Sequence, residues 1–377
     1  MWNKLKTLCA EKIRPVFFVP RELTAKSSRL FFLDGFRSVA LVFMVASHGL
    51  KSWIRPDLMN AYIVNLNKIP APIFFFLVGA SYILSRNARL RKGLSREQVL
   101  FSYVRRSLVL FALALVYKIM DILFGTPFEY IRWWEVDVLN IIAISLFLTA
   151  LFDYLVHRST QSRRGYLAVA LLGVALAPLM FRMHFPPGFP NLVRLYLQGT
   201  QAEYAWFTLL PYSGYTFFGA WMVQSFVEGY LEKPFLNLQN VGLLLLACMG
   251  AGQGLAYISD NTLIDDCALS LFYYSRAFLL LAAGVYAAFH FQRLIGFGPF
   301  LIVGTYTMIG YWVHAKIVYL YYKPFLGNQD WAGSFGLLFK TYLITFAVVF
   351  AWSEIKKRVK AWKKKAAPCP ASSFLKP

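Results

Sequence analysis

Long apolar runs recur along the chain, separated by short segments that carry most of the charges and prolines. Within each run the apolar positions are contiguous and do not alternate with polar ones, which favours helices over the strands of a membrane barrel. Each run is close to the roughly 20 residues that a helix needs to cross a bilayer core. We therefore predict ten membrane-spanning helices, at about residues 32–52, 69–85, 102–124, 136–156, 165–181, 205–227, 240–258, 268–290, 297–321 and 335–353.

The amino-acid composition supports this pattern and excludes an ordinary soluble protein. Hydrophobic residues make up 58% of the 377 residues, charged residues make up 15%, and the mean hydropathy is +0.51. Soluble domains carry about 25% charged residues. Lipid offers the backbone no hydrogen-bond partners, so segments that cross a membrane form helices or a closed barrel. The predicted fold class is all-α, a polytopic bundle of membrane helices.

The distribution of positive charge predicts the orientation of this bundle. The chain has 39 Lys and Arg against 18 Asp and Glu, a formal charge of +21. Such a surplus is also found in nucleic-acid-binding proteins. With the N-terminus inside, however, 27 of the 39 basic residues fall in inner segments and only 7 in outer loops. The positive-inside rule then places both termini in the cytoplasm, and no nucleic-acid partner is expected.

Three regions follow from this topology. Residues 1–28 form a basic cytoplasmic segment that leads into the first span without a small-residue cleavage site, as in an uncleaved anchor. Residues 29–353 form the transmembrane domain. Residues 354–377 form a basic cytoplasmic tail next to the membrane, where we expect contact with anionic lipid.

Motifs for metals, disulfides and phosphate loops are missing from the sequence. The four cysteines, at positions 9, 248, 267 and 369, have no paired spacing. The chain also has no P-loop and no GxSxG nucleophile motif. We therefore expect neither a metal ion nor a tightly bound cofactor.

Ionisable groups inside the first predicted span are the first candidates for function, because polar groups in hydrocarbon are costly. Asp34 and Arg37 are three residues apart on one helical face, which suits either a local ion pair or an anion site. His48 follows Arg37 by eleven residues, close to three turns and roughly 16 Å along the axis. This helix could hold an anionic substrate at Arg37 and carry out proton transfer at His48.

Further polar groups are predicted at a similar depth in other spans. His314 and Tyr311 lie in the outer half of the ninth span, and Arg276 lies in the eighth. Asp137 and Asn140 begin the fourth span, three apart on one face. Histidine is the usual general base near neutral pH, and a carboxylate such as Asp137 would orient its ring. The sequence does not show whether these groups converge.

Four segments resemble those of membrane acyltransferases. Residues 29–48, which read RLFFLDGFRSVALVFMVASH, are similar to the first helix of the heparan-alpha-glucosaminide N-acetyltransferase-like family of bacterial membrane proteins. Residues 72–81, 137–145 and 311–319 resemble three further motifs of that family, in the same order. The likeness covers about residues 29–350. One position departs from the pattern, because Ser38 follows Arg37 where the family has glycine.

This resemblance implies transfer of an acyl group, most often acetyl, from acyl-CoA to a hydroxyl or amine of a glycan or lipid-linked acceptor. It also implies ten or eleven helices in a bacterial cytoplasmic membrane. By position, His48 would be the base or a transient acyl carrier, and Arg37 would hold the CoA end. Asp137, Asn140 and His314 would line the reaction chamber.

Two other functions fit the same residues. A transporter or lipid flippase would use Arg37, Arg276, Asp137 and the histidines as a substrate or proton path, although the sequence shows no internal repeat. An inactive accessory subunit of a membrane assembly would use its many aromatic residues for subunit contacts. Dependence on acyl-CoA distinguishes the enzyme from both alternatives.

Overall fold

The structure is a computed structural model that describes residues 31–59, 69–124, 135–156, 159–183, 185–186, 188–198, 207–227, 243, 246–247, 250–251, 274–281, 283 and 298–366. In this part of the chain the regular structure is helical and no β-strand forms, as predicted. The N-terminal segment and most of the predicted spans 240–258 and 268–290 lie outside the described residues. The chain divides into a terminal unit, residues 1–64 with 291–377, and a central unit, residues 65–290.

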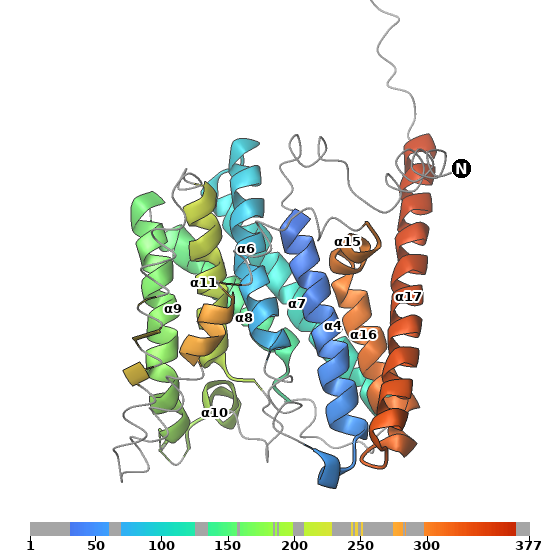
Figure 1. The fold of residues 1–377 in the computed structure, drawn as a ribbon. Coiled ribbons are helices and arrows are strands. Elements are labelled where there is room, and N and C mark those ends of the chain that lie inside the picture. Colours follow the sequence, from blue (N-terminus) through green and yellow to red (C-terminus); the bar gives the residue numbers. More distant parts are fainter. Residues whose placement is uncertain are drawn as a thin grey trace, which may run out of the picture. The chain divides into compact units, whose positions relative to one another are not determined.

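The terminal unit is built around its first helix, which packs against three helices from the other end of the chain. Figure 1 shows α17, the longest helix, beside α16 and α4. The predicted ninth span is broken at Tyr306 into two helices and ends in a π-helical turn. The elements are α4 (Phe31–Trp53), η2 (Pro56–Leu58), α15 (Gly298–Thr305), α16 (Thr307–Lys316), η6 (Ile317–Tyr321), η7 (Lys323–Phe325) and α17 (Trp331–Ala366).

The backbones of α4 and α15 approach closely because small residues lie where they cross. A Cβ atom on Gly304 would lie 1.8 Å from the carbonyl oxygen of Asp34, so only glycine fits there. The Ser38 hydroxyl donates a hydrogen bond to the Phe300 carbonyl and joins the same two helices. Tyr342 of α17 donates to the Val42 carbonyl at 2.6 Å. These contacts hold α4 in a fixed position against its partners.

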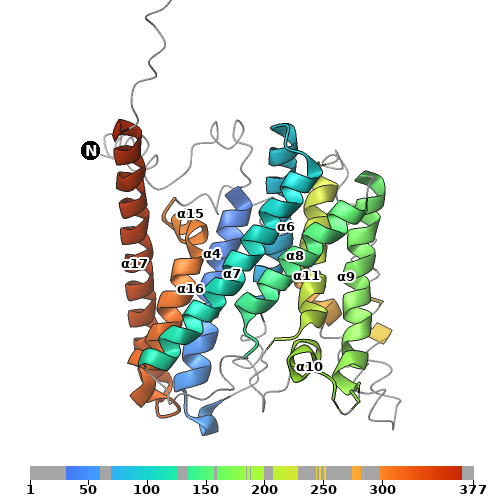
Figure 2. The same cartoon turned by 180° about the vertical axis from the view of Figure 1, so that it is seen from behind.

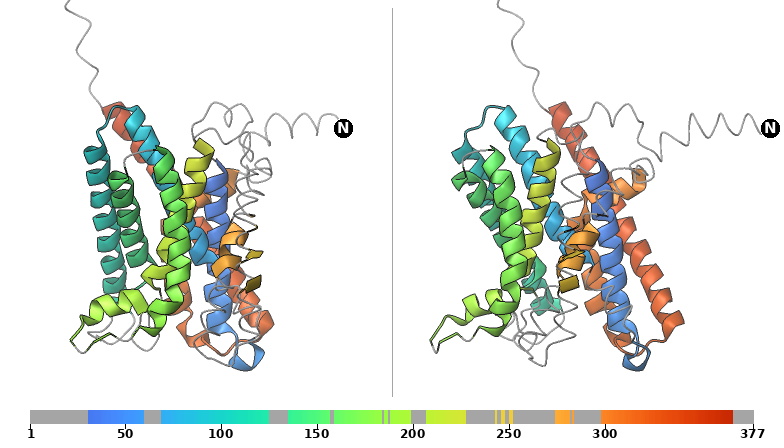
Figure 3. Two further views of the ribbon diagram at one scale, coloured as in Figure 1. Left: turned by 90° about the vertical axis from the view of Figure 1, so that its left-hand side faces the viewer. Right: turned by 60° about the vertical axis from the view of Figure 1, so that its left-hand side comes forward.

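The central unit consists of helices packed around α11. This helix contacts α6, α8 and α9, while α7 packs along α8. Figures 2 and 3 show the short helix α10 lying across the end of α9. The elements are α6 (Pro70–Arg91), α7 (Arg96–Phe124), α8 (Val138–Leu155), α9 (Ser159–Arg182), α10 (Asn191–Gln198) and α11 (Leu209–Val227).

Glycine also sets the crossing of α6 and α11. A Cβ atom on Gly79 would lie 1.8 Å from the Thr216 carbonyl oxygen, and one on Gly219 would lie 2.0 Å from the Phe76 carbonyl oxygen. The two glycines therefore let the two backbones touch, as small residues do between membrane helices. Any larger residue at either position would push the helices apart.

Four helices in the described part of the chain are long and apolar enough to cross a membrane: Pro70–Arg91, Arg96–Ile119, Val138–Leu155 and Trp331–Trp362. Phe101 and Leu108 on α7 expose apolar surface outward, which suits contact with lipid. An all-α membrane protein is thus confirmed, while the count of ten spans and the cytoplasmic termini stay predictions. The last helix differs from its predicted end at residue 353, because α17 continues to Ala366.

Candidate active site

A pair of histidines lies at the centre of the terminal unit. His48 on α4 and His314 on α16 face each other, with the Nδ1 of His48 3.2 Å from the Nε2 of His314. His314 is fully buried and His48 is half-buried. Two histidines predicted independently from separate spans are therefore in direct contact, although 266 residues separate them in sequence.

The hydrogen bonds of this pair fix the tautomer of both neutral rings. The Nδ1 of His314 lies 2.9 Å from the Gly310 carbonyl oxygen, which can only accept. That nitrogen must carry the proton, so the Nε2 of His314 is an acceptor. The Nδ1 of His48 then donates to it, which leaves the Nε2 of His48 with a free lone pair. This arrangement can accept a proton from a substrate.

Two tyrosine rings lie beside the histidine pair in the terminal unit. Tyr311 is edge-on to His314 with ring centroids 5.8 Å apart, and Tyr319 lies 5.8 Å from His48. Tyr319 belongs to the π-helical turn, a distortion that occurs often at functional sites. The structure thus places Tyr311 beside the pair and adds Tyr319, which the sequence did not single out.

Arg37 forms the ion pair that its spacing suggested. Its Nη1 lies 2.5 Å from the Oδ1 of Asp34 in the same helix. Asp34 is buried, whereas the side chain of Arg37 is about a quarter exposed at 26%. Since α4 is helical from Phe31 to Trp53, Arg37 and His48 share one face of a continuous helix. The contact of Arg37 with CoA stays a prediction.

Asp137 and Asn140 belong to the central unit, where they form the start of α8. The Asp137 side chain caps the helix by accepting from the Asn140 backbone N–H at 3.0 Å. The Asn140 side chain donates to the Tyr196 hydroxyl at 3.0 Å, and its buried Oδ1 has no partner among the described residues. Because a buried polar atom without a partner is costly, Asn140 is suited to bind a donor group of a substrate.

Two further cations, Arg276 and Lys118, lie on helices of the central unit. Arg276 is half-buried in the helical segment 274–281, whose Phe278 packs on Tyr215 and Phe218 of α11. Lys118 of α7 donates to the Glu135 carbonyl. That Arg276 binds substrate stays a prediction.

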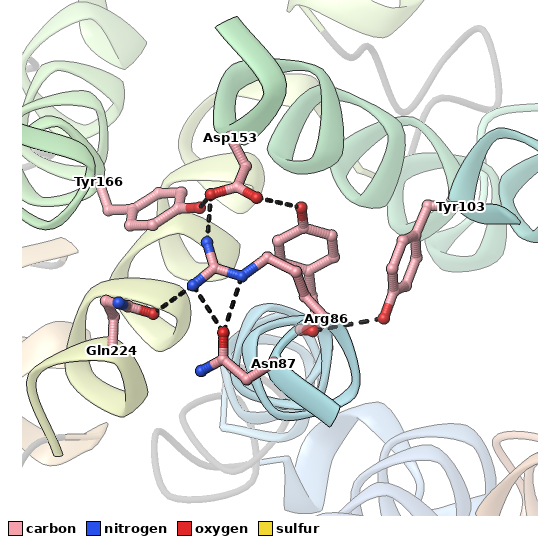
Figure 4. Close-up of polar contacts among 7 residues, drawn as sticks. Arg86, Asn87, Tyr103, Asp153, Tyr166 and Gln224 are labelled. Atoms are coloured by element: carbon pink, nitrogen blue, oxygen red, sulfur yellow. Dashed lines mark hydrogen bonds and ion pairs between the residues drawn. The ribbon is translucent and has the colours of Figure 1, made fainter. Parts of the chain in front are cut away.

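A second polar cluster, which we call the Arg86 hub, joins the helices of the central unit (Figure 4). Asp153 of α8 accepts from Arg86 and Tyr82 of α6 and from Tyr166 of α9. Arg86 also donates to Gln224 of α11 at 2.7 Å. The hub comprises Tyr82, Arg86, Asn87, Asp153, Tyr166 and Gln224.

The Arg86 hub has a structural role, because Arg86 donates to Asp153, Asn87 and Gln224, while Asp153 also accepts from Tyr166. Arg86 was not singled out from the sequence, and the structure gives it this role. The sequence contained one signal for it. Asp153 is a carboxylate inside the predicted span 136–156, and such a residue needs a partner.

A comparison with models of protein families shows to which family the chain belongs. The model of the heparan-alpha-glucosaminide N-acetyltransferase catalytic domain matches residues 29–264, more than half of the chain. The chain belongs to this family. The match includes α4, α6 and α8, which carry three of the four motifs quoted above, whereas His314 lies beyond it. No curated protein matches the chain.

Membership in this family makes the chain a membrane acetyltransferase. No group of three or more His, Cys, Asp or Glu side chains that could hold a metal ion occurs in the described ranges. Among the described residues, the histidine pair places a basic ring nitrogen, the Nε2 of His48, outside the hydrogen bonds that join the two rings.

Proposed function

We propose that the chain transfers an acyl group, most simply acetyl, from acyl-CoA to a hydroxyl or amine of a glycan or lipid-linked acceptor, with His48 as the general base. One observation carries the proposal: the bond from His48 to His314 leaves the Nε2 of His48 unprotonated and fixed in direction. General-base catalysis depends on such a positioned lone pair.

The histidine pair accounts for every proton that moves in this transfer. The Nε2 of His48 removes the proton of the acceptor O–H or N–H while the oxygen or nitrogen attacks the thioester carbonyl. The C–S bond then breaks, and the CoA thiolate takes the proton back from the imidazolium. His314 holds the ring and accepts its Nδ1–H throughout, as the third member of a triad does.

His314 acts as an orienting residue in this scheme and not as the donor to the oxyanion. Both of its ring nitrogens are engaged, one by the Gly310 carbonyl and the other by His48. The oxyanion is therefore left to Tyr311, whose ring lies beside that of His314. Arg37, three turns before His48, would meet the CoA phosphates.

Purified protein tests the base directly. Transfer of label from radiolabelled acetyl-CoA to a glycan or lipid acceptor should fall by about 10²–10⁴-fold in His48→Ala, the usual contribution of general-base catalysis. His157→Ala is the control, because this histidine is outside the pair. A thermal unfolding midpoint equal to that of the parent would show that His48→Ala keeps its fold.

The outcome separates the alternatives. Equal rates in His48→Ala and parent remove His48 from the mechanism. If acetyl-CoA neither reacts nor raises the midpoint of the parent, the transporter or accessory-subunit interpretation replaces the enzyme, because a ligand that binds the folded state stabilises it.

A further inference from the structure

The end of α17 carries an exposed apolar stripe that continues past the predicted membrane boundary. Val348, Trp352, Ile355, Val359 and Trp362 are spaced four, three, four and three residues apart, so they share one helical face. All five are exposed, Ile355 at 51% and Trp362 at 68%. An apolar stripe of this kind is not stable in water, so it must face lipid or a partner.

Basic residues flank this stripe. Lys356, Arg358 and Lys360 are all exposed, and they fall on both sides of the stripe at 100° per residue. The ammonium of Lys356 lies 5.6 Å from the ring centroid of Tyr306 and 5.7 Å from that of Trp352. A cation held between aromatic rings is typical of the headgroup level of a membrane.

The length of α17 fits a helix that reaches from headgroup to headgroup. Trp331 and Trp362 are 31 residues apart on one helix, about 46 Å at 1.5 Å per residue. A bilayer with its headgroup regions is about 40–45 Å thick, and helices tilt by about 20° on average. The basic turns of residues 356–360 therefore fall at one headgroup layer, with Val348 and Trp352 nearer the acyl chains and Trp362 on the outer side of that layer.

A second copy of the chain is a poorer occupant of this stripe. The four-three spacing would suit a coiled coil, but the positions that flank the seam are basic on both sides. Two such helices would repel each other. Anionic headgroups instead complement the charge.

We propose that residues 352–362 of α17 form a binding surface for anionic phospholipid headgroups, with Lys356, Arg358 and Lys360 as the phosphate contacts. Trp352 and Ile355 contact the adjoining acyl chains, and Val359 and Trp362 lie among the headgroups. In the predicted topology this surface belongs to the cytoplasmic leaflet. The surface is independent of the acyl-transfer chemistry.

Binding of fluorescent phosphatidylglycerol to the full chain in detergent micelles tests the surface, with fluorescent phosphatidylcholine as the reference. The parent should prefer phosphatidylglycerol, and added salt should weaken the preference. Changing Lys356, Arg358 and Lys360 to Gln should lower the affinity about five-fold for each charge removed. Lys356→Arg, Arg358→Lys and Lys360→Arg together should retain it.

A matched control removes three charges elsewhere, by Arg91→Gln, Lys92→Gln and Arg96→Gln at the turn between α6 and α7. This variant should keep the preference. Equal loss in both glutamine variants would show a general charge effect and overturn the proposal. An unchanged preference in the α17 variant would overturn it too, as would an acidic protein that co-purifies through this stripe in the absence of lipid selectivity.

Discussion

At the scale of single residues, the proposed function depends on which nitrogen of each histidine carries a proton. The Gly310 carbonyl can only accept, so it fixes the proton of His314 on Nδ1. The Nε2 of His314 is then an acceptor, which fixes the proton of His48 on its Nδ1. In the proposed mechanism a second histidine orients the base, where the sequence suggested a carboxylate such as Asp137. Asp137 is engaged as the cap of α8.

His314 should behave as a positioning residue. In His314→Ala the ring of His48 loses its acceptor, and kcat should fall roughly 10²-fold with little change in KM, within the range that acid–base groups contribute. His314→Gln should recover part of the rate, because its amide oxygen can accept from the Nδ1 of His48. The measurements are steady-state kinetics and the pH–rate profile, whose acid limb should move in the alanine variant.

Loss of rate in both variants together with a lower unfolding midpoint would indicate a purely structural role for His314. Full activity in His314→Ala would contradict the orienting role altogether.

At the scale of helices, close crossings and one buried ion pair determine the arrangement of the central unit. Gly79 and Gly219 allow α6 and α11 to touch, and the Arg86 hub then ties both to α8 and α9. An ion pair with little exposure contributes only when both partners are present. Its role is therefore to specify which helices are neighbours.

The hub predicts a stability difference between single and double variants. Arg86→Met leaves the Asp153 carboxylate without its cation and should cost about 3–5 kcal/mol. Arg86→Met with Asp153→Leu removes both charges and should recover most of that loss. Thermal unfolding in detergent compares the three proteins. A double variant no more stable than Arg86→Met would show that the ion pair does not account for the loss.

At the scale of the whole molecule, charge and hydropathy predict an orientation in the membrane. Four basic residues lie in or beside the turn between α6 and α7, namely Arg89, Arg91, Lys92 and Arg96, whereas residues 317–330 between α16 and α17 contain one basic residue, Lys323. The positive-inside rule places these two segments on opposite sides.

Cysteine labelling measures this orientation. In a background with the native cysteines changed to serine, Pro324→Cys should react with a membrane-impermeant maleimide in intact cells. Lys92→Cys should react only after the cells are permeabilised. Labelling of both positions from the same side would contradict the predicted topology.

The sequence by itself determined the helical class, the approximate positions of the long described helices and the family. These follow from local properties, because a run of apolar residues specifies a membrane helix wherever it lies in the chain. It also singled out His48, His314, Tyr311 and Asn140. The break of the ninth span at Tyr306 and the continuation of α17 to Ala366 were not predicted, since apolarity alone does not mark a kink or a helix end in water.

Only the tertiary structure decided which polar groups meet. The partners His48 and His314 are 266 residues apart, and Arg86 and Asp153 are 67 apart. No local pattern carries that information, because such pairs depend on the packing of helices distant in sequence. Packing thus brought His314 against His48 and placed Arg86 against Asp153 in the central unit.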